Sequence, residues 1–355
     1  MLRHACTFAP ATLMTAALLT GGAGFSGWVA TPAAAQATSA AAPILAAEPV
    51  ADLGVYRDDA VEVVRDASRS EDAQLRTHAL AAVEHAPDLA LPLVTLGLTD
   101  DSVPVRFAAL RTAGQLRLAA LTGMFGEAFR PAEKNSPAAD HIRAAMVFAA
   151  YRCGVANDQL ISQMAVVLQS PNPQVRANAA MLLGDMGDNS AIPLLRMAVH
   201  RPAGDKHAGA PWRLLRTQVA EAQAKLGDVN GLNELRQSLY SSDFEVRITA
   251  VKALGGLGDD AFWSNLNNFL IENPVEFRLA AAEGLARLGR DRGGMLTVMA
   301  EAANHPKWTV RAQSAFALGP YDNDLARGYL VRLLKDPSPQ VRISAAAAIL
   351  EATAG

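Results

Sequence analysis

The stretch that decides the fold is Val175-Arg176-Ala177-Asn178-Ala179-Ala180-Met181-Leu182-Leu183-Gly184-Asp185-Met186-Gly187-Asp188. When this phrase is moved along the chain, an arginine in the same setting recurs at positions 76, 106, 143, 176, 216, 247, 278, 311 and 342. Successive gaps are 30, 37, 33, 40, 31, 31, 33 and 31 residues. One helix-turn-helix unit per period of this length is typical of an α-solenoid. We therefore predict an all-α fold, a right-handed α-solenoid of about nine helix-turn-helix repeats.

The start and stop signals of the helices support this pattern. In the fourth unit we expect helices over residues 157–169 and 174–186, because Asn172-Pro173 supplies an N-cap followed by a proline in the first turn. Ser338-Pro339 repeats this device, and Gly187-Asp188, Gly227-Asp228 and Gly258-Asp259 indicate helix ends in left-handed geometry. Val175, Ala179, Leu182 and Met186 share one helical face, which we expect to pack inward.

The phrases Val175–Gly184, Val246–Gly255 and Val310–Gly319, with Val341-Arg342 and its run of alanines, carry a family resemblance. They resemble the short HEAT-like repeats of the phycobilin-lyase type within the HEAT-repeat superfamily. The resemblance covers residues 48–355 and implies the solenoid fold. It implies less about function, since that superfamily includes scaffolds, adaptors and a few enzymes.

Composition and charge exclude some classes of partner. The 355 residues are 50% hydrophobic but only 6% aromatic, which suits closely packed helices rich in Ala, Leu and Val. The net charge is −3, and removal of a leader containing Arg3 leaves 31 basic against 35 acidic residues, or −4. This balance gives no attraction for a phosphate backbone, so we expect no nucleic-acid partner.

The N-terminus predicts export. Arg3 and His4 precede a stretch without Asp, Glu, Lys or Arg that extends to residue 47 and contains a moderately apolar middle and Ala33-Ala34-Ala35-Gln36-Ala37. This pattern is typical of a signal peptide. We assign residues 1–37 to an export signal, 38–47 to an Ala/Pro-rich tether and 48–355 to the solenoid, and we expect a periplasmic or secreted protein. An uncleaved anchor is the alternative, but the glycines and threonines of this segment make a poor membrane span, so none is expected after cleavage.

The repeated arginine has a structural interpretation. We expect it to tie each unit to its turn and to bind acceptors across repeats, with Asp72, Asp101, Asp243, Asn273 and Asp336 as the acceptors. A residue that recurs in every repeat is expected to stabilise the repeat itself, so we do not assign this arginine to ligand binding.

Candidates for chemistry are few. Cys153 is the only thiol left after processing and is interpreted as a small core residue. His78 and His85 share a helix face, and His200, Asp205 and His207 lie close together, but neither group offers the ligands that a metal needs, so solvated histidines are expected. The iron-binding His-Glu pairs of a HEAT-like hydroxylase do not occur in this chain. We predict no enzyme activity, no cofactor and no metal.

Two surfaces are candidates for binding another protein. Gaps of 37 and 40 residues place insertions at residues 131–137 and 201–210, and insertions on one edge of a solenoid often mark its binding face. The outward face of the second helices is the other candidate, because it lines the concave side of such arrays. The candidate contact residues are Glu133, Lys134, Arg201, Lys206, His207 and Trp212 in or beside the insertions, and Arg111, Arg152, Glu221, Lys225, Lys252, Arg287 and Phe316 on the concave strip.

Three functions remain open. The leading hypothesis is an exported scaffold or adaptor that binds another protein of unknown identity without catalysis. The alternatives are a lyase-type HEAT-like enzyme or enzyme accessory subunit, and a self-associating structural element. The last follows from the C-terminus, where no polar cap helix follows the ninth unit, so that we expect an open apolar end.

Overall fold

The computed structural model describes residues 46–130, 136–155, 159–199, 209–259, 262–271, 274–290 and 294–354. The proposed export signal and nearly all of the tether therefore lie outside the described residues. Within these ranges the chain forms helices and no strand, which confirms the predicted all-α solenoid.

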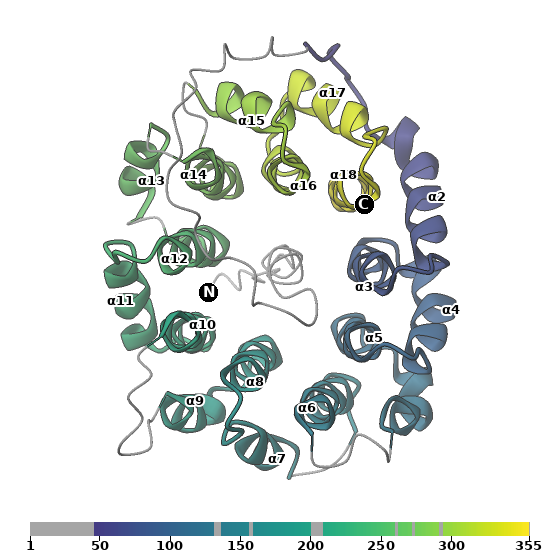
Figure 1. The fold of residues 1–355 in the computed structure, drawn as a ribbon, viewed down its shortest axis with the longest axis vertical. Helices are drawn as coiled ribbons and strands as arrows, with labels where there is room; N and C mark the ends of the chain where they lie inside the picture. Colours follow the sequence, from purple (N-terminus) through teal and green to yellow (C-terminus); the bar gives the residue numbers. More distant parts are fainter. Residues whose placement is uncertain are drawn as a thin grey trace, which may run out of the picture.

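The helices form two concentric layers (Figure 1). The inner layer contains the nine helices that carry the repeated arginine: α3 (Ala73–Ala82), α5 (Val103–Gln115), α6 (Pro137–Arg152), α8 (Pro173–Met186), α10 (Ala210–Lys225), α12 (Phe244–Leu257), α14 (Val275–Arg287), α16 (Trp308–Leu318) and α18 (Pro339–Ala352). The outer layer is α2 (Arg57–Ser68), α4 (Pro87–Leu98), the 3-10 helix η3 (Ala119–Ala128), α7 (Leu160–Val167), α9 (Ile192–Ala198), α11 (Val229–Ser238), α13 (Trp263–Phe269), α15 (Met295–Ala303) and α17 (Asp324–Leu333). Short 3-10 turns lie at Gly54–Tyr56 (η1), Val83–His85 (η2) and Asn189–Ala191 (η5).

The array closes on itself, which the sequence did not predict. Helix α18 packs against both α2 and α3, so the last unit meets the first and the helices form a ring (Figure 1). Ile343, Ile349 and Leu350 of α18 are at most 1% exposed. The expectation of an open, uncapped C-terminal repeat is therefore wrong: the first unit covers that apolar face, and self-association through it has no exposed surface to use.

The outer layer closes in the same place, and we call this junction of the two chain ends the seam. The N–H of Val50 donates to the carbonyl of Asp324 at 2.9 Å, and Arg327 Nε donates to the carbonyl of Val50 at 2.9 Å. Arg57 of α2 donates to the hydroxyl of Thr353, just after α18, also at 2.9 Å. Residues before α2 thus bind α17, and both layers are continuous across the seam.

Local signals explain where the inner helices begin and end. Helix α8 begins at Pro173 after Asn172, whose side chain accepts from the N–H of Gln174, as predicted. Helix α18 begins at Pro339, but the Ser338 side chain makes no capping hydrogen bond. Gly187, Gly227 and Gly258 have φ of +78°, +85° and +70°, the left-handed helix stop expected from the Gly-Asp pairs.

The glycine that ends the repeated Leu-Gly phrase permits close approach of inner helices. A Cβ on Gly184 of α8 would lie 2.9 Å from the Cα of Ala222 in α10, and one on Gly255 of α12 would lie 2.7 Å from the Cα of Gly284 in α14. Such distances are shorter than real Cβ contacts allow, so these positions require glycine. Helix pairs without this glycine contact each other less extensively.

The third unit departs from the pattern. Its outer element, η3, is a 3-10 helix that contains Gly123 and Gly126, and glycine weakens an α-helix. Just before it, Arg117 occupies the position of the usual terminal glycine and has φ of +52°, a left-handed conformation that costs a non-glycine residue free energy.

The seam can be tested with a buried charge. Ile349 is fully buried in α18, the helix that packs against α2 and α3, so Ile349→Asp places an unpaired carboxylate there at a cost of several kcal/mol. We expect the ring to open while helicity is retained, giving a larger radius of gyration in small-angle X-ray scattering. Leu254→Asp, at the equivalent buried position of α12, is the matched control, because the polypeptide chain still connects that unit to both of its neighbours. Unchanged dimensions for Ile349→Asp would show that the seam does not hold the ring closed.

Candidate functional site on the inner surface

Part of the arginine ladder serves the architecture. Nη1 of Arg76 donates to the carbonyls of Ser70 and Glu71 in its own turn at 2.8 and 2.9 Å, and Nε and Nη2 donate to Asp100 of the next turn at 2.8 and 2.9 Å. Arg311 repeats both contacts, with Asp336 as the acceptor in the next unit. These two arginines therefore join adjacent units.

The acceptors differ from most of those predicted. Only Asp336 accepts from the repeated arginine of the preceding unit, as expected. Asp72 and Asp243 instead accept from the N–H groups of Gln74 and Glu245 as N-caps, and Asp101 pairs with Arg130. Asn273 lies outside the described residues. The sequence analysis missed three acceptors in following units, Asp100 for Arg76, Glu234 for Arg216 and Glu301 for Arg278. Asp100 lies one residue before the predicted Asp101.

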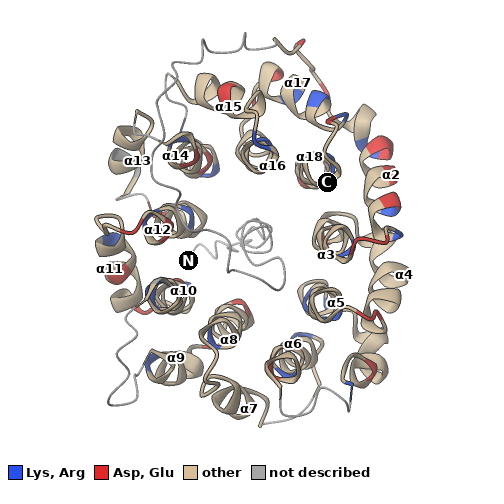
Figure 2. Ribbon diagram, viewed as in Figure 1, with Lys and Arg blue, Asp and Glu red and all other residues tan. Residues whose placement is uncertain are grey.

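A second set of charges faces the centre of the ring. Residues two, five and nine positions after each arginine share one helix face, since each residue advances the helix by about 100°. This face and the adjoining residue Glu84 carry five acidic and five basic side chains. Figure 2 shows the acidic residues in red and the basic residues in blue along the ribbons of the inner helices. We call them the inner belt: Glu84, Asp185, Glu221, Glu283 and Glu351, with Arg111, Arg152, Lys225, Lys252 and Arg287.

Contacts between helices that are not neighbours place the belt on the concave side. Gln115 of α5 donates to Asp185 of α8 at 3.2 Å, past α6, and Arg287 of α14 lies 3.6 Å from Glu351 of α18, past α16. Arg111 and Glu84 form an ion pair at 2.5 Å, with side chains 5% and 4% exposed. Contacts of the belt thus link α5 to α8 and α14 to α18 across the helix that lies between them.

Two lysines of the belt differ in their partners. Burial opposes the charge of Lys225, but the carboxylates of Asp185 and Glu221, both 3.1 Å away, outweigh it and raise the pKa of Lys225. Lys252 has only the more distant Glu283 to oppose its burial, which lowers the pKa of Lys252 to about 8. The side chain of Lys252 is nevertheless half-buried rather than fully enclosed, so its ammonium keeps some contact with solvent.

Burial also shifts the pKa values of two side chains in η2, the 3-10 turn that follows α3. It raises the pKa of the Glu84 carboxyl although Arg111 favours the ionised form, and Asp185 adds to the rise. Burial lowers the pKa of His85 below 6.5, with Arg287 and Arg111 acting in the same direction and Glu351 against it. The His85 imidazole is therefore neutral at pH 7.

Several polar atoms on this face are buried without a hydrogen-bond partner. They are Nε and Nη2 of Arg111, Nε of Arg152, Oε1 of Gln218, Oε2 of Glu283, Nη2 of Arg287 and Nε2 of Gln313. Arg111, Glu283 and Gln313 are at most 8% exposed. A buried donor or acceptor left unsatisfied costs about 1–3 kcal/mol, so this face is suited to groups from another molecule.

The predicted contact residues fall into three sets. Arg111, Arg152, Glu221, Lys225, Lys252 and Arg287 gather in the inner belt. Glu133, Lys134, Arg201, Lys206 and His207 lie outside the described residues. Trp212 and Phe316 are 8% and 3% exposed, so they are core residues rather than surface residues, and the Trp212 ring lies 4.5 Å from the guanidinium of Arg176.

The belt also contains residues that the sequence analysis did not select. Asp185 and Glu351 lie nine residues after Arg176 and Arg342, the same offset as Arg152, Lys225 and Arg287. His85 and Gln115 share this offset in the first two units. A charged or polar residue nine positions after the repeated arginine therefore marks the belt in the sequence. This pattern becomes visible when that position is compared in every unit.

Other groups offer little chemistry. Burial raises the pKa of the half-buried Cys153 thiol, whose Sγ lies 3.7 Å from the carbonyl of Ala113, so the thiol is protonated at neutral pH. His78 is 1% exposed, which corrects the expectation of a solvated histidine. In the described ranges no three His, Cys, Asp or Glu side chains are grouped so that they could hold a metal ion.

Comparison with known families agrees with the repeat geometry. Residues 132–210 match the model of HEAT repeats, and the described helices of this range, α6 to α9, belong to the same two layers as the others. Residues 132–210 are therefore HEAT repeats. The remaining units share the repeated arginine and the two-layer arrangement.

Solved structures of similar arrangement were also found. The complex of CpcE and CpcF of phycocyanin lyase from Nostoc sp. is 19% identical, covers 71% of this chain and 91% of its own, and has a TM-score of 0.39. Human deoxyhypusine hydroxylase is 19% identical, with coverages of 76% and 97% and a TM-score of 0.38. Kap121p is 14% identical, with coverages of 81% and 37% and a TM-score of 0.34. No curated protein matches the sequence.

Within the described part of the chain, no helix is both long and apolar enough to cross a bilayer.

Substitution of Lys225 and of Lys252 by methionine compares a well-paired lysine of the belt with a poorly paired one. Lys225→Met leaves Asp185 and Glu221 without their cation and should lower the free energy of unfolding by about 3 kcal/mol at pH 7. Lys252→Met removes a poorly compensated ammonium and should leave stability unchanged or raise it by about 1 kcal/mol. Urea titrations followed by circular dichroism measure both effects.

The contribution of Lys252 to the free energy of unfolding should increase as the pH rises. Because the pKa of Lys252 is about 8 in the folded chain against 10.5 as its ordinary value, protonation penalises the folded state below pH 8. The penalty shrinks between pH 8 and 10.5 and is absent above. Any gain from Lys252→Met should fade over the same range, and a gain that stays constant with pH would contradict this account.

Proposed function

We propose that the protein is a non-catalytic scaffold that holds a segment of another protein against the inner surface of its ring, in the periplasm or outside the cell. The observation that carries this proposal is the set of buried, unpartnered polar atoms on that surface. It includes donors, such as Nε2 of Gln313, and acceptors, such as Oε1 of Gln218. A polypeptide backbone offers both N–H and C=O groups and can satisfy both kinds.

The charge of the belt supports a polypeptide segment of low net charge. Five acidic and five basic side chains balance, so the surface has no overall sign to attract nucleic acid or a strongly charged peptide. Specificity would then come from the positions of individual donors and acceptors, because groups that fail to pair on burial are penalised.

The proposed location follows from the N-terminal sequence pattern, and it can be tested directly. If residues 1–37 are removed on export, the mature protein begins after Ala37. We expect intact-mass measurement and N-terminal sequencing of protein from the native envelope or medium to find this end. A full-length chain recovered from the cytoplasmic fraction would contradict the proposed location and leave the ring unaffected.

The binding surface can be tested with a photo-crosslinking amino acid. Thr249 lies on the inner face of α12 but makes none of the belt contacts, whereas Val166 on the outer helix α7 is 64% exposed. We expect a crosslinker at 249, but not at 166, to capture one defined protein from the native compartment. Equal capture at both positions would exclude the inner surface as the specific site.

A substitution separates binding from stability. Gln313→Leu removes an unpartnered donor, so we expect the free protein to gain about 1 kcal/mol of stability while crosslinking from position 249 falls several-fold. A residue with only a structural role would not move these two measurements in opposite directions. Unchanged crosslinking would contradict the role of this surface.

A further inference from the structure

At the seam the repeated arginine has no carboxylate partner in the next turn, in contrast to Arg76 and Arg311. Arg342 belongs to the last unit, and its Nη1 donates to the carbonyls of Asp336 and Pro337 at 2.8 and 3.2 Å, as Arg76 and Arg311 do in their own turns. Arg76 and Arg311 also bind the carboxylate of Asp100 or Asp336 through Nε and Nη2. Within the described residues, Nε and Nη2 of Arg342 make no such contact.

The reason lies in the first unit. Asp100 and Asp336 each lie six residues before the next repeated arginine and accept from the N–H two residues later, at 2.8 Å in both cases. The residue six positions before Arg76 is Ser70, whose hydroxyl accepts from the N–H of Asp72 at 3.1 Å. Ser70 thus has the same turn contact but lacks a carboxylate.

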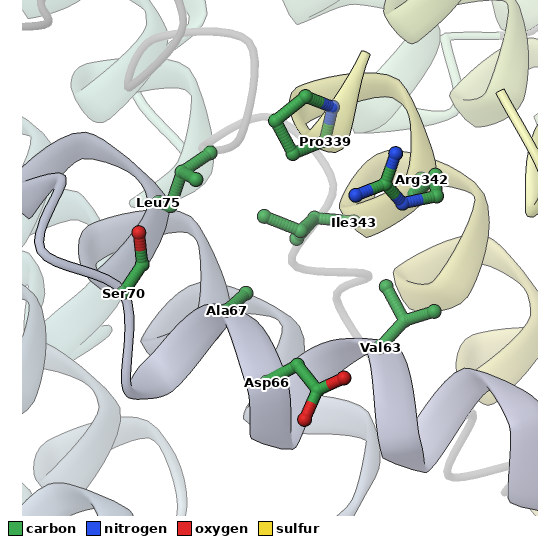
Figure 3. Close-up of a pocket in the computed structure, with 8 residues that line it drawn as sticks. All are labelled: Val63, Asp66, Ala67, Ser70, Leu75, Pro339, Arg342 and Ile343. Carbon is green, nitrogen blue, oxygen red and sulfur yellow. The ribbon is translucent and has the colours of Figure 1, made fainter. Parts of the chain in front are cut away.

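A pocket of about 300 Å³ lies at this position. Figure 3 shows Arg342 and Ile343 of α18 opposite Val63 and Ala67 of α2, with Ser70 and Leu75 beyond them. The pocket therefore combines a guanidinium edge with apolar walls. Its volume is at the small end of the range for ligand sites.

We propose that the seam pocket binds a small monocarboxylic acid. The ligand carboxylate accepts from Nε and Nη2 of Arg342, as the carboxylates of Asp100 and Asp336 do from their arginines, and its apolar body lies against Val63, Ala67 and Ile343. Bidentate binding of this kind is the strongest form of the guanidinium-carboxylate interaction. The proposal is independent of partner binding on the inner surface.

Binding would also couple to closure of the ring. Arg342 belongs to the last helix, whereas Val63 and Ser70 belong to the first unit, so the ligand contacts both ends of the chain. A ligand that binds only the closed ring favours that state by mass action. The seam would then be more resistant to opening when the acid is present.

Asp66 lines the same pocket and forms no ion pair with Arg342. An anionic ligand experiences repulsion from this exposed carboxylate. The proposal therefore predicts that Asp66→Asn binds the acid several-fold more tightly than the natural chain.

The probes are the straight-chain carboxylates from acetate to octanoate at pH 7, with the matching amides as uncharged controls. We expect calorimetry to show binding of the acids but not the amides, with affinity rising along the series until the pocket is full. Arg342→Met should weaken binding at least tenfold. Hydrogen exchange should slow in α2 and α18 when the acid binds.

The decisive variant is Ser70→Asp, which supplies the missing carboxylate from the chain itself. We expect it to raise the melting temperature by a few degrees and to abolish binding of the acids. Asp100→Ser, the matched control, makes the opposite change at a step that has the carboxylate and should lower the melting temperature. The proposal is overturned if no acid in the series binds, or if Ser70→Asp still binds the acids as the natural chain does.

Discussion

The packing of α18 against α2 and α3 is the constraint on which the rest of the structure depends. An open solenoid leaves its two terminal units with one uncovered apolar face each, and such ends usually need polar caps. Here each terminal unit covers the other. Closure also fixes the curvature of the inner layer, so that side chains from helices two places apart, such as Gln115 and Asp185, come within hydrogen-bond distance.

The curvature itself is built from small residues. Gly114, Gly184, Gly255 and Gly319 each lie eight residues after the repeated arginine and meet Phe148 or a small residue six positions after the next one. The helix pairs α5–α6, α8–α10, α12–α14 and α16–α18 contain this glycine and contact each other more extensively than the intervening pairs. Closer and wider steps thus alternate from α3 to α18, and at the seam the two wider steps α18–α3 and α3–α5 follow one another, which a strictly uniform repeat would not require.

Much of this fold could be predicted from the sequence because its signals are local. The arginine period, Asn172-Pro173 and the Gly-Asp stops each act within one unit, and the structure confirms them. Closure could not be predicted, since it is the sum of small rotations between units that no single phrase encodes. The same limit applies to the site: Arg111 and Lys225 were selected from their own helices, whereas their partners Glu84 and Asp185 come from neighbouring units.

Some arginines of the ring have all their donors bound within the chain, whereas others have free donors, and we expect binding at the second kind. At Arg76 and Arg311 every turn carbonyl and carboxylate is in place, so the ladder there stabilises the array and offers nothing to a ligand. Arg111 and Arg342 have the same guanidinium fork but leave donors unpaired, one on the inner surface and the other at the seam. An unpaired buried donor lowers stability without an architectural return, so the departure at Arg111 is better explained by a partner outside the chain than by the fold.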